Sequence, residues 1–347
     1  FDRADYACYR EVNERLATAL LGLLKPDDLV WVHDFHLFPL GAALRTLGVA
    51  QRIGFYLHVP FPPAALFSAV PWADDLLRDL AAYDVIGVQT DGDARHLAEA
   101  LVNLGETDAA GRVKAYPAGI DFAAFAQQAA RAMAGRPLAR LMGSLGDRAL
   151  VFGVDRLDYT KGLPQRFMGY GKLLERFPAH RGRTTYLQIA PLSRTEVAEY
   201  RDLKRELDEL AGRINGQFAD LDWVPLRWIT RSFSRATLAG VMRTARVGLV
   251  TPLRDGMNLV AKEFVAAQDP ADPAVLILSR FAGAAEAPRE AVLVNPHDPD
   301  ELADALDAAL TMPLDERQAR WQKLAEAVRR DSARRWGRSF IEDLESA

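Results

Sequence analysis

The feature that most constrains this fold is a regular alternation of short apolar runs with segments of helical periodicity. Short apolar runs followed by amphipathic segments are typical of βα units, in which successive strands run parallel. Right-handed crossovers then place helices on the faces of each sheet. The sequence therefore predicts an α/β protein with parallel, doubly wound sheets.

The same patterns give the positions of the individual elements. The expected strands are residues 28–33, 52–58, 84–89, 112–116, 149–154, 184–190, 224–229, 246–250, 274–279 and 291–294. The expected helices are residues 6–24, 39–47, 72–82, 91–104, 163–176, 194–213, 234–244, 258–268, 299–310 and 314–331. Because the carboxyl ends of parallel strands bind ligands in open α/β folds, informative residues should follow these strands directly.

A chain of 347 residues is long enough for two domains of ordinary size. Residues 127–148 are rich in Ala, Arg and Gly, which favours a domain boundary in that segment. We expect a first Rossmann-like domain over residues 1–135 and a second over residues 136–330. Residues 331–347 are expected to form a C-terminal helix, with packing back onto the first domain as one option.

Composition excludes several classes of protein. Hydrophobic residues make up 49% of the chain and charged residues 26%, as in soluble globular proteins. A net charge of −4 gives no sign of nucleic-acid binding. No apolar run approaches the ~20 residues of a membrane span, and no signal peptide is evident, so a cytoplasmic location is expected. The one cysteine, Cys8, excludes an intramolecular disulfide and a Cys-based zinc site.

Residues 251–270 (TPLRDGMNLVAKEFVAAQDP) combine a strand end, a Gly-containing turn and a helix start. Such a junction directs free backbone N–H groups towards a ligand at the sheet edge. Glu263 lies one turn into this helix among apolar residues, where its carboxylate could accept hydrogen bonds from sugar hydroxyls. An acidic residue favoured by the helix dipole, worth about 0.3–1 kcal/mol, explains Glu263 equally well on this segment alone.

A second cluster follows the strand at residues 149–154. Arg156 and Lys161 place two cations on one loop, and Gly162 precedes the next helix. Two cations beside a helix N-terminus are suited to a diphosphate. The alternative is an ion pair between Arg156 and a neighbouring aspartate, and we favour the diphosphate interpretation.

Imidazole groups gather at the strand ends of the first domain. His33 and His36 flank Asp34, and His58 precedes a rigid Pro-rich turn. A buried structural imidazole is the simplest explanation for a single histidine. The spacing lacks the i, i+4 pattern of helical zinc sites, and no third ligand is evident, so no metal is expected.

Two other enzyme classes fit less well. Asp34 and Asp255 could form a glycosidase carboxylate pair, but the cations of the 155–162 loop favour a phosphorylated donor instead. Gly169-Tyr170-Gly171 has Leu174 where a dinucleotide fingerprint requires glycine, and no Walker-type loop is present. A dehydrogenase is therefore disfavoured.

Several long motifs together resemble the trehalose-6-phosphate synthases of glycosyltransferase family 20. The motifs are WVHDFHL (31–37), GFYLHVPFP (54–62), VDRLDYTKGLPQRF (154–167), AGRINGQF (211–218), the 251–270 segment quoted above and LSRFAGAA (278–285). The resemblance implies the glycosyltransferase-B architecture, with two Rossmann-like domains facing across a cleft. The family also has an N-terminal segment with a Gly-rich loop, and since Phe1 already lies next to a helical pattern, we expect the first domain to be incomplete.

The resemblance also implies an activity. Glucose would move with retention from UDP-glucose to glucose-6-phosphate, giving α,α-trehalose-6-phosphate and UDP. UDP-glucose would be a co-substrate, so neither a cofactor nor a metal is expected, and neither a nucleic acid nor a membrane is an expected partner. A homo-oligomer stays open. The alternatives are a related synthase with another phosphorylated acceptor or with ADP-glucose, and a non-catalytic nucleotide-sugar-binding module.

Residue roles carried over from the family complete these expectations. Arg156 and Lys161 would hold the diphosphate, and Glu263 would bind the ribose. Asp34 and Arg194 would bind the acceptor, and His58 would lie near the reacting centre of the donor sugar. The donor glucose and the nucleotide would contact Phe233, Asp255, Gly256, Met257, Asn258, Leu259, Val260, Ala261, Lys262 and Glu263.

Overall fold

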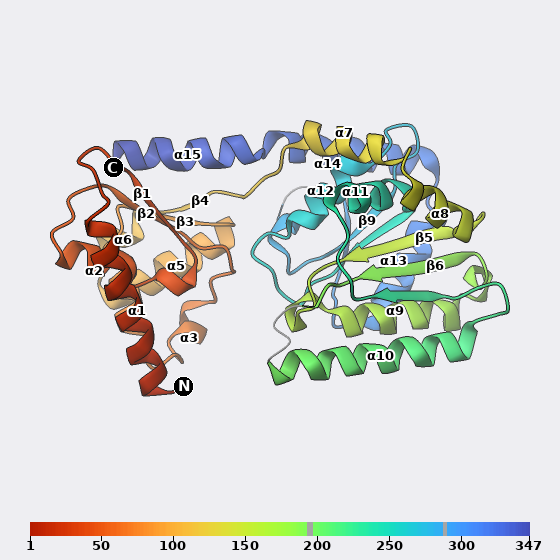
Figure 1. The fold of residues 1–347 in the computed structure, drawn as a ribbon, viewed down its shortest axis with the longest axis horizontal. Coiled ribbons are helices and arrows are strands. Elements are labelled where there is room, and N and C mark those ends of the chain that lie inside the picture. Colours follow the sequence, from red (N-terminus) through yellow and green to blue (C-terminus); the bar gives the residue numbers. More distant parts are fainter. Residues whose placement is uncertain (193–196, 287–289) are drawn as a thin grey trace. The chain divides into compact units, whose positions relative to one another are not determined.

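A computed structural model describes residues 1–192, 197–286 and 290–347. The chain divides into two compact units (Figure 1). The first comprises Phe1–Ala118 together with Ala333–Ala347, and the second comprises Gly119–Ser332. Each unit contains its own parallel sheet, so the predicted α/β class with two domains of parallel strands is confirmed.

The first unit is built on a four-stranded parallel sheet in the order β1-β2-β3-β4. Its strands are β1 (Val30–His33), β2 (Ile53–Tyr56), β3 (Val85–Val88) and β4 (Val113–Ala115). Its helices are α1 (Arg3–Leu21), η1 (Phe35–Leu37), α2 (Leu40–Thr46), α3 (Ala64–Phe67), α4 (Ala73–Leu80), α5 (Asp91–Leu104), α6 (Thr107–Ala110) and α15 (Ala333–Ser346). The register pairs His33 with Tyr56, which brings the carboxyl ends of β1 and β2 to one edge.

Helix α15 covers one face of this sheet although it lies at the far end of the sequence. Phe340 is fully buried, and its ring stacks on Trp31 with centroids 4.4 Å apart. A Cβ atom added at Gly54 would lie 2.6 Å from the Phe340 ring, and one at Gly87 would lie 2.8 Å from it. Glycines in two neighbouring strands therefore make room for the aromatic side chain that anchors α15.

The second unit contains a six-stranded parallel sheet in the order β10-β9-β8-β5-β6-β7 among the described residues. Its strands are β5 (Ala149–Val154), β6 (Thr184–Ile189), β7 (Leu226–Ile229), β8 (Val247–Val250), β9 (Val275–Ser279) and β10 (Val292–Val294). Its helices are α7 (Phe122–Ala132), α8 (Arg136–Leu145), η2 (Tyr159–Lys161), α9 (Leu163–Arg176), η3 (Pro178–His180), α10 (Ala198–Phe218), α11 (Arg235–Thr244), α12 (Leu259–Ala267), η4 (Gly283–Ala285), α13 (Pro299–Thr311) and α14 (Leu314–Arg330).

Two separate cores flank this second sheet, as a doubly wound fold requires. One core packs α7, α8, α11, α12 and α14 against the strands, and the other packs α9, α10 and α13 (Figure 1). The strands are buried on both faces, which explains why they read as continuous apolar runs in the sequence.

The compact units divide at a different place from the expected ranges. The segment expected to hold the boundary near residue 135 contains the two helices α7 and α8. Phe125 and Ala129 of α7 are buried in the second core, and α7 packs against α11 and α12. Burial of this face places residues 119–135 in the second unit, so the first crossing between units lies at 118/119.

None of the helices in the described part of the chain is both long and apolar enough to cross a membrane. The described residues likewise contain no cluster of three or more His, Cys, Asp or Glu side chains that could hold a metal ion.

The packing of α15 predicts a large effect for one truncation. Phe340→Ala removes a fully buried ring and is expected to lower the free energy of unfolding by about 3–5 kcal/mol, measured by urea titration. Ile341 on the same helix is 38% exposed, so Ile341→Ala is the matched control, with an expected loss below about 1 kcal/mol. Equal losses in the two variants would contradict this packing.

Candidate functional site

Asp34 and His58 lie together at the carboxyl edge of the first sheet. Asp34 follows β1 directly and has φ 74° and ψ 163°, a conformation that is costly for any residue with a side chain. Its backbone N–H donates to the carbonyl of Tyr56 at 2.8 Å. Its carboxylate accepts from the backbone N–H of His58 at 3.3 Å. These two bonds hold the carboxylate at the end of β2 despite the backbone strain.

The imidazole of His58 is paired with that of His33. Nδ1 of His33 and Nε2 of His58 are 3.1 Å apart, a hydrogen bond that requires one ring to accept. Burial lowers the pKa of His33, and the neighbouring His58 lowers it further, whereas Asp34 acts in the opposite direction. Burial also lowers the pKa of His58, again opposed by Asp34. The pair is therefore neutral near pH 7, and His58 can donate or accept a hydrogen bond.

The loop after β5 presents an exposed cation, Arg156. Arg156 is exposed, and we find no hydrogen bond or ion pair for it among the described residues. The neighbouring aspartates are engaged elsewhere: Asp155 pairs with Arg166 at 2.5 Å, and Asp158 accepts from the backbone N–H of Thr160 at 2.9 Å. The alternative ion pairs considered for Arg156 from the sequence are thus not formed.

Lys161 and Asp255 bring two strand-end loops together. Nζ of Lys161 lies 2.5 Å from Oδ2 of Asp255, across 94 residues of sequence. Both side chains are about one-fifth exposed, at 17% and 18%. Asn258 donates to the same carboxylate oxygen at 3.1 Å. A lysine has three donors, so Nζ can hold Asp255 and still serve an anionic ligand.

Arg166 of α9 is fully buried and contacts the backbone of Lys161. Its guanidinium donates to Asp155 at 2.5 Å, to Oγ1 of Thr251 at 3.0 Å and to the carbonyl of Lys161 at 3.0 Å. Burial acts to lower the pKa of Arg166, but Asp155 and Tyr186 together outweigh burial, and the pKa is raised. One cation therefore fixes the loops that follow β5 and β8 relative to each other.

The turn that leads into α12 carries the second strained residue. Asn258 has φ 71° and ψ 83°; with Asp34 it completes the set of non-glycine residues with positive φ in the described chain. Its Oδ1 atom is buried without a hydrogen-bond partner among the described residues. At the start of α12 the N–H of Ala261 donates to the carbonyl of Asn258 at 3.2 Å, and the N–H groups of Leu259 and Val260 precede the first intrahelical acceptor. The turn therefore presents backbone donors, whereas the Oδ1 acceptor of Asn258 is enclosed by protein.

The residues in and just before α12 differ in how far they are buried. Met257, Ala261 and Lys262 are buried, so only their backbone is available to a ligand. Burial lowers the pKa of Lys262, opposed by Asp331. Glu263 is one-fifth exposed, and its Oε1 accepts from Nη2 of Arg235 at 2.8 Å.

The remaining predicted residues differ in how they are placed. Phe233 is half-buried, and the guanidinium of Arg231 lies 4.6 Å from its ring centroid. Leu259 is exposed and Val260 half-buried at the start of α12. Arg194 lies outside the described residues.

Comparison with known proteins identifies the family of this chain. A family model described as glycosyltransferase family 20 matches residues 1–346, almost the whole chain. The chain belongs to glycosyltransferase family 20. The resemblance drawn from the sequence motifs is thereby confirmed.

Relatives and solved structures of family 20 agree over the full length of the chain. A trehalose-6-phosphate synthase of Sinorhizobium fredii is 48% identical and aligns over 99% of this chain and 76% of its own length. The crystal structure of an alpha,alpha-trehalose-phosphate synthase (UDP-forming) from Burkholderia vietnamiensis matches with a TM-score of 0.97 and 47% identity, over 100% of this chain and 78% of that one. A Burkholderia xenovorans synthase in complex with glucose-6-phosphate matches with a TM-score of 0.96 and 44% identity, over 99% and 79% of the two chains.

Several contacts of this family 20 member were not anticipated from the sequence. Arg166 was missed, although an arginine on an otherwise apolar helix face beside Leu163, Phe167 and Tyr170 signals a buried charge with a fixed partner. His33 was considered only as one of a flanking pair, not as the partner of His58. The ion pair of Glu263 with Arg235 had no local sequence signal, because the two residues lie 28 positions apart.

The imidazole pair of this family 20 member yields a test by titration. An Asp34 carboxylate favours the protonated form of His58, so Asp34→Asn is expected to lower the pKa of His58 further below its ordinary value. Nitrogen-detected NMR of the imidazole rings across pH 4–8, a range set about the usual His value near 6.5, measures this directly. Asp27→Asn, at an exposed position of the same unit, is the control and should leave the titration unchanged. A rise in the pKa of His58 on Asp34→Asn would refute the electrostatic assignment.

Proposed function

We propose that this family 20 member transfers glucose from UDP-glucose to glucose-6-phosphate with retention, forming α,α-trehalose-6-phosphate and UDP. One observation carries the proposal: Lys161 and Asp255 from two strand ends form a fixed pair, and the exposed cation Arg156 lies on the same loop as Lys161. Relatives of the family support it, since one structure holds glucose-6-phosphate and an E. coli trehalose-6-phosphate structure (46% identity, TM-score 0.95, covering 100% of this chain and 79% of that one) holds UDP-2-fluoro glucose.

The donor diphosphate would bind to the two cations of the β5 loop. Arg156 has no partner to give up within the described part of the chain, so its planar guanidinium is free for bidentate contact with phosphate oxygens. Lys161 keeps its contact to Asp255 and directs its remaining donors to the same group. Preorganised charge of this kind stabilises the UDP leaving group as negative charge develops on it.

The donor sugar and nucleotide would be held by the turn and first helical residues after β8. The Asp255 carboxylate and the backbone of residues 256–259 together supply acceptors and donors suited to glucose hydroxyls. Glu263 would accept hydrogen bonds from the ribose hydroxyls. Phe233 and the 259–263 segment would line the nucleotide site.

The acceptor would bind at the edge of the first sheet. Asp34 offers a carboxylate held by the backbone N–H of His58, and the neutral His58 imidazole suits a hydroxyl near the reacting centre of the donor sugar. Arg194 would bind the acceptor phosphate; it stays a prediction from the family resemblance.

The reaction exchanges one bond to the anomeric carbon of the donor for another on the same face of the sugar. The bond from C1 to the β-phosphate oxygen breaks, and a bond from C1 to the anomeric oxygen of glucose-6-phosphate forms. The proton of the attacking hydroxyl passes to an oxygen of the departing phosphate. A cytoplasmic location is a further prediction, and whether the enzyme forms a homo-oligomer stays open.

The role of Arg156 gives a kinetic test. Arg156→Ala is expected to lower kcat for glucose-6-phosphate-dependent UDP release by about 10²–10³, by analogy with the loss of one oxyanion donor. UDP affinity, measured by calorimetry on the same variant, should fall as well. Arg213→Ala removes an exposed arginine of α10 and serves as the control, with both quantities unchanged. Wild-type turnover and UDP affinity in Arg156→Ala would contradict the role of Arg156 in binding the donor diphosphate.

A further inference from the structure

Glu263 can recognise a ribose only if its carboxylate is held in one orientation. A glutamate side chain has several rotatable bonds, and fixing them costs entropy that weakens ligand binding unless the protein has already done so. Packing alone leaves Glu263 one-fifth exposed, so another group must fix the carboxylate. The group in contact is the guanidinium of Arg235, 2.8 Å from Oε1.

Arg235 occupies an electrostatically unfavourable position. It is the first residue of α11, where the positive end of the helix dipole opposes a cation by about 0.3–1 kcal/mol. The side chain is 64% exposed, so its own packing gives little compensation. The Glu263 carboxylate offsets the unfavourable interaction of the Arg235 cation with the helix dipole. The ion pair therefore favours the observed position of both side chains.

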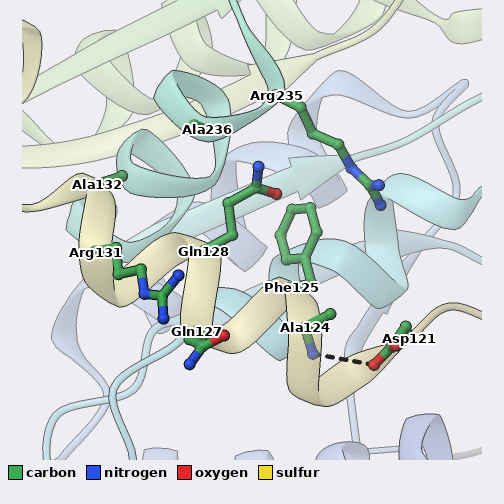
Figure 2. A pocket seen from close by; sticks show the side chains of 9 residues that line it. All are labelled: Asp121, Ala124, Phe125, Gln127, Gln128, Arg131, Ala132, Arg235 and Ala236. Atoms are coloured by element: carbon green, nitrogen blue, oxygen red, sulfur yellow. Dashed lines mark hydrogen bonds between the residues drawn. The ribbon is translucent and has the colours of Figure 1, made fainter.

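The other side of the Arg235 guanidinium rests on α7. It lies 5.1 Å from the ring centroid of Phe125, a residue buried in the core of the second unit. Figure 2 shows Arg235 and Phe125 beside each other. Both line a groove between α7 and α11 with a volume of about 490 Å³. The ring of Phe125 and the carboxylate of Glu263 thus both contact the guanidinium and favour this position of the exposed side chain.

Within the described residues, the contact to Arg235 uses Oε1 of Glu263, and no hydrogen bond to Oε2 is found. We propose that Arg235 is a positioning residue for donor recognition: it fixes the Glu263 carboxylate through Oε1 and leaves Oε2 to accept the ribose hydroxyls. This inference rests on the proposed function, because it requires a ribonucleotide at Glu263. The opposing explanation is an exposed ion pair that contributes nothing to binding, which is common for such pairs.

The two explanations differ in how binding depends on the ribose hydroxyls. The test compares the affinities of UDP and 2′,3′-dideoxy-UDP by calorimetry in the wild type and in Arg235→Ala. Arg235→Ala is expected to weaken UDP about tenfold, the effect of losing about 1.4 kcal/mol from a hydrogen bond to a charged group. It should leave the dideoxy analogue unchanged, because that ligand makes no hydroxyl contact to Glu263.

A matched control separates this effect from general electrostatics. Arg205 forms an exposed pair with Asp202 at 2.9 Å on α10, so Arg205→Ala removes a comparable contact away from the site and should change neither affinity. Equal weakening of both ligands by Arg235→Ala, or unchanged UDP affinity, would overturn the positioning role.

Failure of the proposed function has a different signature. A wild-type protein that binds no UDP contradicts the nucleotide-sugar site itself, and the inference falls with it. A wild type that prefers UDP over the dideoxy analogue, loses the preference in Glu263→Gln and keeps it in Arg235→Ala would overturn only the role of Arg235. A wild type that binds both ligands equally would overturn the ribose contact of Glu263 and therefore the inference.

Discussion

The buried guanidinium of Arg166 holds together the two loops on which the second unit's polar residues are built. Its hydrogen bonds to Asp155, to Thr251 and to the backbone of Lys161 give the loops after β5 and β8 one shared anchor. Removing one partner of a buried charge typically costs about 3–5 kcal/mol, because the remaining charge is left without compensation. The exposed cation Arg156 and the pair of Lys161 with Asp255 depend on this anchor for their placement.

The two strained residues show how the fold stores conformational energy where polar groups gather. Asp34 and Asn258 each adopt positive φ at a strand end or helix start, at about 1–3 kcal/mol each. Each is held by side-chain and backbone hydrogen bonds to its neighbours, which explains how the strain persists. In both units the strained residue directs a carboxylate or an amide to the carboxyl edge of a parallel sheet.

Much of this organisation could be predicted because it depends on local patterns. Each expected strand corresponds to a strand of the structure, since buried parallel strands read as short apolar runs between turn residues. The polar residues Asp34, Arg156 and Asp255 could be placed after strand ends for the same reason, because each lies in the segment that follows such an apolar run. The boundary between the units was harder to predict, because Ala-rich helices such as α7 resemble a linker in composition. The burial of Phe125 in the second core shows that α7 packs there.

The contacts of the site could not be predicted from spacing. Arg166 reaches Thr251 across 85 residues, and Arg235 reaches Glu263 across 28. Such pairs depend on which strands become neighbours and on the conformation of the loops between them. Neither property produces a periodic pattern in the sequence. The interaction of His33 with His58 is of the same kind, because it requires β1 beside β2.

The position of α15 has a consequence for biosynthesis. The first unit is completed by the last residues of the chain, whereas the second unit is one continuous segment. During translation, Trp31 and the strand glycines Gly54 and Gly87 emerge long before Phe340, the side chain that packs against them. The second unit can therefore fold as its chain emerges, but the apolar face of the first sheet stays uncovered until residues 333–347 have been made. The newly made protein thus depends on completing α15 before that face meets another unfinished chain.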